Sequence, residues 1–539
     1  MSAPDWPAPI TDRFDGSSDL GGRAVTALAV VLAFVLVVPL AWLFVQTATL
    51  GDRIPALLTS ATTLAVLGRS IALVTVVTGA SILIGVPLAV LTVQSNLPFK
   101  RFWTVAAALP LAVPSYLGAF AFISAFGPRG AFADLLAPLG IERIPSVFGF
   151  WGAVFVLTIY TYPYVFLTTR ASLLSLDASI VEAARTLNAG RFEAFRRVTL
   201  PQIAPGIAAG ALLVALYALA DFGTPAFMRV QVFTQFIYSR VDAFQQGYAA
   251  LLSLQLLAVT GVILLLESRI GADDEGAYES RGNRGAFGFD LGVLRYPAML
   301  LPAGIGLLAV VLPLGIFTAW LFRPGTGLAS KGMAFEWVFA ANSVQVAVFA
   351  AVASLVVALP IGLRGANAGS RLSRLAERAP YVGYATPGIV LALALLWFTL
   401  DVAPVVYQRY GIALLVFAYV VRFSSQAVGS IRTSVLQVDS RLHEAARTLG
   451  RSRLQTFRAV TLPLIVPGVA TGAALVFLTT MKELPATLML RPLGFETLVT
   501  HIWSVRETGA YGQAAIPALV LVAISALSMG VILHQERRT

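Results

Sequence analysis

Cysteine is absent from all 539 residues, and charged residues make up only 12% of the chain. Without cysteine the chain has no disulfides, no thiolate metal ligands and no cysteine nucleophile. None of its three lysines follows a glycine, so it lacks the Gly-Lys-Ser/Thr signature of a phosphate-binding P-loop. The three histidines, His443, His501 and His534, are scattered over different segments, so no metal site is predicted.

Apolar residues, by contrast, make up 58% of the chain, and its mean hydropathy is +0.81. So much apolar surface does not fit into one water-soluble core, and the composition predicts an all-α membrane protein. A membrane-spanning helix needs about 20 largely apolar residues. Twelve such stretches are predicted, at residues 24–47, 70–94, 102–126, 148–169, 202–221, 249–266, 297–321, 342–363, 379–400, 410–429, 464–481 and 513–534.

The charges around these stretches predict the orientation of the chain. Residues 1–23 are polar, and the apolar run after them has no small-residue cleavage site, which indicates an anchor rather than a cleaved signal peptide. With the N-terminus in the cytoplasm, the cytoplasmic loops and termini hold 25 of the 38 Lys and Arg residues, and the outer loops hold 12. This is the positive-inside bias of a multi-pass membrane protein surrounded by lipid, here with both termini cytoplasmic. The net positive charge therefore does not indicate a nucleic-acid partner.

The two halves of the sequence contain the same motif. Glu182-Ala-Ala-Arg-Thr-Leu187 recurs 262 residues later as Glu444-Ala-Ala-Arg-Thr-Leu449, and 18 of 29 positions are identical between 182–210 and 444–472. Six predicted spans separate the copies, an even number, so the chain is predicted to consist of two parallel six-helix pseudo-repeats. The predicted divisions are a cytoplasmic tail at 1–23, a first half at 24–266 with its loop at 177–201, a cytoplasmic linker at 267–296, a second half at 297–534 with its loop at 439–463, and a tail at 535–539.

Each repeated loop is predicted to form a helix, a turn and a second, arginine-rich helix. Asp177 and Asp439 stand where a helix N-cap is expected. Asn188 and Gly450 follow the first helix, and both residue types tolerate the left-handed conformation that ends a helix. A proline then fits the start of the next membrane helix. These prolines are Pro201 and Pro463, and the apolar face of the first helix consists of Ile180, Ala183, Ala184 and Leu187 in one copy and Leu442, Ala445, Ala446 and Leu449 in the other.

The repeated loops have two possible partners. A basic hairpin resting on lipid headgroups would also carry arginines. Headgroup binding, however, requires neither a glutamate nor the same register in two loops, whereas a protein partner requires both. The loops are therefore predicted to dock a protein.

The pattern of Glu-Ala-Ala, three further residues, a glycine and a downstream Leu-Pro resembles the loop signature of ABC importer permeases. The second copy matches it in full at Glu444-Ala-Ala446, Gly450 and Pro463, whereas the first copy has Asn188 in place of the glycine. The resemblance implies a type I importer permease of the bacterial or archaeal cytoplasmic (inner) membrane. Its loops would be coupling helices seated in grooves of two copies of an ATP-binding subunit. ATP and Mg would be bound, and ATP hydrolysed, by those subunits. No cofactor and no catalytic residue is then expected in this chain.

Three further segments resemble the fused double permeases of ferric-iron importers, whose relatives carry thiamine, phosphonates, polyamines or sugar phosphates. They are Ala220-Asp-Phe-Gly-Thr-Pro225, Lys482-Glu-Leu-Pro-Ala-Thr-Leu488 and Ala385-Thr-Pro-Gly388, and the resemblance covers nearly the whole chain after residue 24. It implies a cargo delivered by an extracytoplasmic substrate-binding protein, with ferric iron expected first and the other cargoes left open.

Polar and ionisable residues within or near the predicted spans are candidates for the translocation pathway or its gate, because a charge in the membrane is costly unless it is paired or hydrated. Lys482 and Glu483 can instead pair locally or face headgroup water, and the tyrosines can instead hydrogen-bond neighbouring helices. The candidates are Asp221, Thr224, Lys482, Glu483, Tyr160, Tyr162 and Tyr164, with Arg422, Ser424 and Gln426 at the positions equivalent to the three tyrosines.

Two other classes of protein are possible. A secondary transporter coupled to an ion gradient also fits twelve spans and parallel halves, but it needs charged relays in mid-membrane, where the predicted spans hold only Arg422. A membrane-embedded enzyme needs a cluster of catalytic groups, and the one acidic cluster, at 273–275, lies in the predicted linker.

Overall fold

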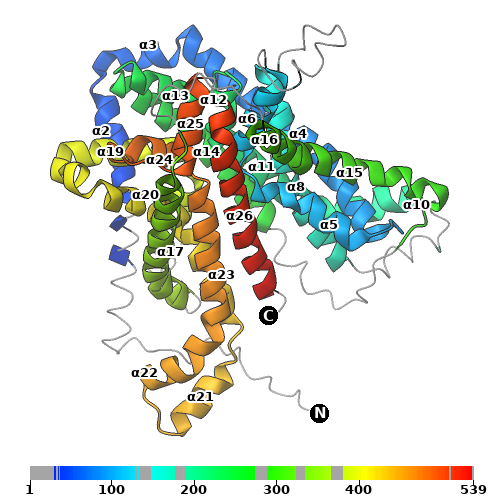
Figure 1. The fold of residues 1–539 in the computed structure, drawn as a ribbon. Helices are drawn as coiled ribbons and strands as arrows, with labels where there is room; N and C mark the ends of the chain where they lie inside the picture. Colours follow the sequence, from blue (N-terminus) through cyan, green and yellow to red (C-terminus); the bar gives the residue numbers. More distant parts are fainter. Residues whose placement is uncertain are drawn as a thin grey trace, which may run out of the picture.

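The computed structural model describes residues 30–31, 34–35, 37–127, 132, 147–176, 186, 190–272, 288–322, 334–365, 380–508 and 511–536. These residues form an all-α bundle, as predicted, with one isolated β-bridge between Ser95 and Phe289 (Figure 1). The helices of the first half are η2 Val38–Ala41, α2 Trp42–Ala48, η3 Gly51–Arg53, α3 Ile54–Leu58, α4 Ala61–Gln94, α5 Lys100–Ala108, η4 Leu109–Ala112, α6 Ser115–Phe126, α8 Phe150–Ser175, α10 Arg191–Ala194, η6 Phe195–Thr199, α11 Leu200–Ala220, α12 Gly223–Phe227, α13 Phe233–Asp242 and α14 Gln246–Ala272.

The second half repeats most of this order. Its helices are η7 Gly292–Arg295, η8 Pro297–Met299, α15 Leu300–Gly306, η9 Leu307–Val311, α16 Leu312–Leu321, α17 Trp337–Gly365, α19 Gly388–Val402, α20 Pro404–Leu436, α21 Ser440–Thr448, α22 Arg453–Thr456, η10 Phe457–Thr461, α23 Leu462–Met481, α24 Pro485–Leu490, α25 Leu498–Thr508, η11 Tyr511–Ala514 and α26 Ala515–Glu536.

Each of the twelve predicted apolar stretches overlaps a helix. Within the described ranges, nine helical stretches are long and apolar enough to cross a membrane, and a tenth is the pair Lys100–Ala112 and Ser115–Phe126, bent by 90°. Two shorter apolar helices, Val38–Ala48 and Gly388–Val402, lie at the first and ninth predicted stretches. The predicted stretches 102–126 and 379–400 are helical but broken, with Pro114 and Pro387 as the N-caps of the helices that follow each break.

The two halves pack their helices in the same way. Helix α4 packs on α8 and α11 in the first half, and α17 packs on α20 and α23 in the second. The first helix of each half also crosses to the other half: α2 contacts α19, and α16 contacts α6. The halves are therefore joined by an exchange of their first helices as well as by the linker.

Glycines at equivalent positions allow the closest helix contacts in both halves. A Cβ on Gly206 would lie 2.0 Å from Ser172 Oγ, and one on Gly468 would lie 1.9 Å from Ser434 Oγ. One turn later, Gly210 and Gly472 approach the backbones of α8 and α20 in the same way. Small residues four apart are typical of tight helix contacts in membranes, so α11 and α23 are held firmly against their neighbours.

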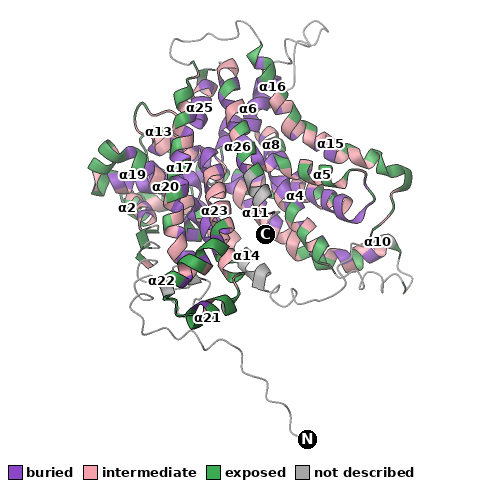
Figure 2. Cartoon of the chain, turned by 60° about the horizontal axis from the view of Figure 1, so that its bottom comes forward, coloured by how far each residue is buried: buried purple, intermediate pink, exposed green. Residues whose placement is uncertain are grey.

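The burial pattern agrees with a lipid environment. Buried residues are concentrated on α6, α8, α19 and α20, whereas α21 and α22 are largely exposed (Figure 2). Large apolar side chains such as Leu83, Leu300 and Leu527 are more than two-thirds exposed on the outward faces of the bundle. Such apolar surface is expected to contact lipid. The end of the bundle that carries α10, α21 and α22 is called the loop end below, and the other is called the opposite end.

Candidate functional site

The second repeated loop forms the predicted helix, turn and helix. The side chain of Asp439 caps α21 by accepting a hydrogen bond from the Arg441 N–H at 2.9 Å. Gly450 has φ +80°, and its N–H donates to the Arg447 carbonyl while the Arg451 N–H donates to the Ala446 carbonyl. These two bonds are those of a Schellman helix end. The predicted N-cap and the predicted left-handed glycine are both confirmed.

A second cap begins the helix after this turn. The Ser452 N–H donates to Gln455 Oε1 at 2.9 Å, and the Gln455 N–H donates to Ser452 Oγ at 3.3 Å, which is a reciprocal capping box. His443 Nε2 lies 2.9 Å from Thr461 Oγ1 and joins α21 to the following helix. The loop is therefore a defined structure that projects from the bundle and is fixed at both of its helix ends.

One face of α21 has no partner among the described residues. Leu449 is 81% exposed, and Leu442, Glu444 and Ala445 are also exposed, whereas Ala446 is buried. An apolar face that the surrounding protein leaves open, bordered by a carboxylate, is suited to the groove of another protein. We refer to the exposed residues Leu442, Glu444, Ala445 and Leu449 as the α21 face.

Most of the first loop lies outside the described residues, including Asp177, Glu182, Ala183, Ala184, Leu187 and Asn188. The described part begins again at Gly190, which takes the position of Ser452, so this copy lacks the hydroxyl of the capping box. Both copies then contain a π-helical turn, η6 and η10, directly before the Leu-Pro pair. Because proline has no N–H to continue the α-helical pattern, Pro201 and Pro463 account for this wide turn.

The equivalent carboxylates Asp221 and Glu483 have the same structural role beyond α11 and α23. Asp221 Oδ2 accepts from the Thr224 N–H at 3.0 Å, and Glu483 Oε1 accepts from the Ala486 N–H at 3.3 Å. Each carboxylate therefore caps the short helix that follows it, α12 or α24.

The second oxygen of each carboxylate has a different partner. Arg422 Nε donates to Glu483 Oε2 at 3.1 Å and forms a buried ion pair, while Ser115 Oγ donates to Asp221 Oδ1 at 3.2 Å. Gly388 leaves room for the longer glutamate, because a Cβ there would lie 2.4 Å from Glu483 Oε1. The two halves thus place a neutral ion pair and an unneutralised carboxylate at equivalent positions.

Lys482 does not pair with its neighbour Glu483. Its Nζ donates to the Leu111 carbonyl at 3.0 Å and so joins the second half to the first. Tyr160 and Tyr162 likewise donate to backbone carbonyls, of Ala309 at 2.9 Å and of Ala107 at 2.7 Å. These bonds favour the helix-contact interpretation of the two tyrosines that the sequence left open.

Three further pathway candidates lie close to these groups without forming one site with them. Gln426 Oε1 accepts from Thr479 Oγ1 at 3.3 Å. The hydroxyls of Thr224 and Ser424 are buried and have no hydrogen-bond partner within the described ranges. In the described segments, no group of three or more His, Asp or Glu side chains is arranged to hold a metal ion.

Comparison with known proteins identifies the family. Its model, described as the inner membrane component of binding-protein-dependent transport systems, matches twice, at residues 81–270 and 354–539. This chain belongs to that family. It is a fused double permease of an ABC importer, a multi-pass protein of the inner membrane and a transport component rather than an enzyme. Permeases of this kind work with ATP-binding and substrate-binding partners.

Relatives of the permease differ in how much of the chain they match. The Fe(3+)-transport system permease protein FbpB 2 of Haemophilus influenzae is 29% identical over 93% of this chain and 96% of its own length. The probable ABC transporter permease protein y4fN of Sinorhizobium fredii is 26% identical over 82% of each chain. The sulfate transport system permease protein CysT of Salmonella typhimurium is 28% identical over only 30% of this chain and 61% of its own length. The two-half organisation is thus matched in full by the first of these relatives.

At the opposite end of the permease the two halves are packed together by aromatic rings. The Phe222 ring centroid lies 5.1 Å from that of Trp503, and Tyr238 lies against both. The guanidinium of Arg506 donates to the Ala226 carbonyl across the same boundary. The loop segments α10 and α21, in contrast, lie well apart in both views (Figures 1 and 2).

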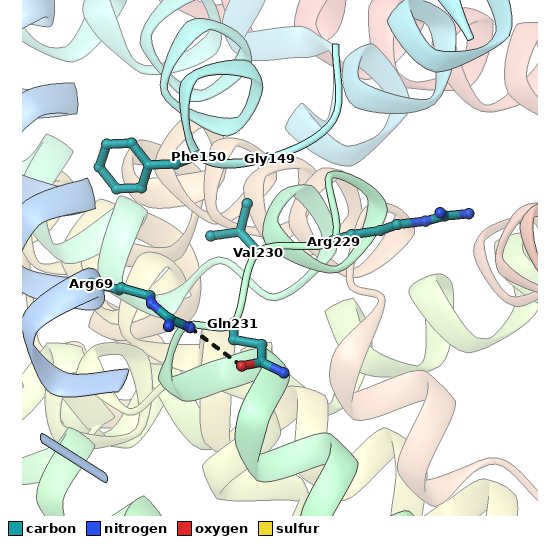
Figure 3. A pocket seen from close by; sticks show the side chains of 6 residues that line it. All are labelled: Arg69, Gly149, Phe150, Arg229, Val230 and Gln231. Atoms are coloured by element: carbon teal, nitrogen blue, oxygen red, sulfur yellow. Dashed lines mark hydrogen bonds between the residues drawn. The ribbon is translucent and has the colours of Figure 1, made fainter. Parts of the chain in front are cut away.

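A cavity of about 410 Å³ lies beside this packed end of the permease (Figure 3). It is lined by residues of α4, of the start of α8 and of the segment before α13. Arg69 donates to Gln231 Oε1 at 3.3 Å, while the Arg229 side chain points to the other side (Figure 3). The cavity is polar at its edges and far from the loop end.

Proposed function

We propose that this permease imports ferric iron through the interface between its halves, with ATP hydrolysed by two copies of an ATP-binding subunit. Each copy engages one repeated loop, at 177–201 or at 439–463, and binds the ATP and Mg. The observation that carries the docking proposal is the α21 face, an exposed apolar face on a helix that is capped at both ends. Its sequence recurs almost unchanged in the first half, which supports a second docking site.

The loop end faces the cytoplasm in this proposal, together with both termini and the linker. The excess of Lys and Arg in the segments on that side supports this orientation. The opposite end then receives cargo from an extracytoplasmic substrate-binding protein. Because the aromatic rings pack the halves together there while the loops lie apart, the arrangement corresponds to a permease closed toward the outside. Docking and closure of the ATP-binding subunits would bring the loops together and open the outer side.

Ferric iron is the proposed cargo because a ferric permease matches nearly the whole chain, whereas the sulfate permease matches less than a third of it. The permease needs no tight metal site of its own for this role, since selection of the cargo is assigned to the binding protein. A path that binds the cargo weakly is sufficient, together with a gate formed by two halves that switch between two arrangements.

The test is uptake by liposomes that contain the permease, its ATP-binding subunits and the loaded binding protein. We expect radiolabelled ferric iron to accumulate inside the liposomes only when Mg-ATP is enclosed in them and the ATP-binding subunits face the lumen. An imposed proton or sodium gradient without those subunits should give no uptake. Gradient-driven uptake by the permease alone would instead identify a secondary transporter.

A further inference from the structure

A buried phenol lies among acidic and phenolic groups where the two halves meet. Tyr116, on α6, is only 4% exposed, and its hydroxyl has no hydrogen-bond partner in the part of the chain that the structure describes. Its ring stacks on that of Phe227 with the centroids 6.2 Å apart, so it packs against α12, the short helix that Asp221 caps. Leaving a buried hydroxyl unpaired costs about 1–3 kcal/mol, so its retention at this point requires an explanation.

The neighbouring groups are oxygen atoms that are only partly used. Tyr217 OH donates to Ser115 Oγ at 3.1 Å, and Ser115 Oγ donates to Asp221 Oδ1 at 3.2 Å, which makes a short chain from phenol to carboxylate. Gly223 lets Tyr116 approach this chain, because a Cβ there would lie 2.5 Å from Tyr116 Cβ. Ser115 thus brings the Tyr217 phenol and one lightly bonded carboxylate oxygen of Asp221 together, and the Tyr116 ring packs beside them on α12.

The two carboxylates of the cluster differ in their cationic partners. Glu483 is neutralised by Arg422, whereas Asp221 has no cationic partner among the described residues. The reason is visible in the repeat, since the position equivalent to Arg422 in the first half is Tyr160, an uncharged residue that bonds to Ala309. A buried negative charge attracts a cation and repels an oxyanion such as sulfate.

We propose that Tyr116, Tyr217 and Asp221, with Glu483 beside them, form a transient contact site for a hard metal cation that passes between the halves. This inference rests on the proposed function and names the residues that the ferric cargo touches. Carboxylate and phenol oxygens are the ligand type that hard cations prefer. Few ligands and an arginine next to Glu483 keep binding weak, as passage through a permease requires.

The position of the site fits a path toward the loop end. Tyr217 lies one helical turn before Asp221 on α11, and its ring lies 6.0 Å from that of Tyr164 on α8. On the other side, Phe222 and Trp503 close the interface. A cation at Asp221 would therefore lie between the closed aromatic layer and the phenols of Tyr217 and Tyr164.

Ferric uptake by the complete reconstituted importer tests this site. We expect Asp221→Asn and the double variant Tyr116→Phe/Tyr217→Phe to lower the initial rate of uptake at least tenfold. ATP hydrolysis stimulated by the loaded binding protein should stay within twofold of wild type, which shows that the variants fold and couple. Tyr248→Phe is the matched control, because its phenol bonds to Thr63 Oγ1 at the opposite end. It should transport at the wild-type rate.

A spectroscopic measurement on the same importer provides a second readout. Addition of ferric nitrilotriacetate should displace a phenol proton to the buffer and produce a visible phenolate-to-iron charge-transfer band in wild type and in Tyr248→Phe, but not in the double variant. Wild-type uptake rates in the variants, or no band in wild type, would overturn the site and leave the proposed function intact. If wild type imports sulfate and no ferric iron, the proposed cargo and this site are both wrong.

Discussion

Replacing Gly450 with valine tests whether the end of α21 governs docking of the ATP-binding subunit. Gly450 has φ +80°, and nothing lies within 4 Å of an added Cβ, so the substitution introduces no clash. Its effect is confined to the backbone, where the left-handed conformation costs an L-residue about 1–2 kcal/mol. Since the α21 face contacts no described part of the bundle, this cost falls on the helix end and its two Schellman hydrogen bonds.

If docking requires that helix end, the same free energy is lost from binding. A loss of about 1–2 kcal/mol raises the Kd for the ATP-binding subunit by a factor of about 5 to 30. The assay is a fluorescence titration of the permease in lipid nanodiscs with the labelled subunit. Gly494→Val is the matched control, because Gly494 has φ +76° in equally open space but lies at the opposite end. Equal Kd values for the two variants would refute the reasoning.

Three other substitutions test separate parts of the structure. Asp439→Ala removes the N-cap of α21, so the Kd for the subunit should rise by the equivalent of about 1 kcal/mol, whereas Asp439→Asn should retain most of the affinity. Arg422→Leu leaves Glu483 buried without its cation and should lower the free energy of unfolding by about 3–5 kcal/mol, measured by thermal unfolding. The double variant Arg422→Leu/Glu483→Gln should recover much of this loss. An unchanged thermal midpoint in Arg422→Leu would contradict the buried ion pair. Burial lowers the pKa of His501 in the folded protein, so near neutral pH the unfolded chain binds more protons than the folded one. The free energy of unfolding should therefore fall as the pH drops through about 6.5. His501→Phe, which keeps the stacking on Phe339, should lose less stability over that range, and an identical pH dependence would contradict the assignment.

The sequence was sufficient to predict the features that depend on local backbone chemistry. Asp439 and Gly450 mark the ends of α21 because an aspartate suits an N-cap and a glycine suits a left-handed residue, and both rules operate within a few positions of the chain. Pro114 and Pro387 are equally local signals, but the length of the apolar stretches around them does not reveal the breaks. Composition shows that a segment is apolar but not where its helix breaks, since Pro87, Pro163 and Pro205 lie inside unbroken helices.

The partners of the charged residues could not be predicted, because they come from distant parts of the chain. Glu483 pairs with Arg422 rather than with adjacent Lys482, and Lys482 reaches Leu111 in the other half. The cluster around Tyr116 was missed for the same reason, although one signal was present: Tyr217 precedes Asp221 by one helical turn. Only the packing of α6 against α12 and of the halves against each other brings these groups together.

Cross-linking from the α21 face tests the docking of the ATP-binding subunit most directly. The chain has no cysteine, so a single introduced cysteine gives an unambiguous attachment point. Leu449→Cys, at an 81% exposed position on the α21 face, should cross-link to the ATP-binding subunit through a short thiol-reactive linker. Leu493→Cys, fully exposed at the opposite end, should give no such product. Cross-linking at position 493 and none at position 449 would contradict docking at the repeated loop.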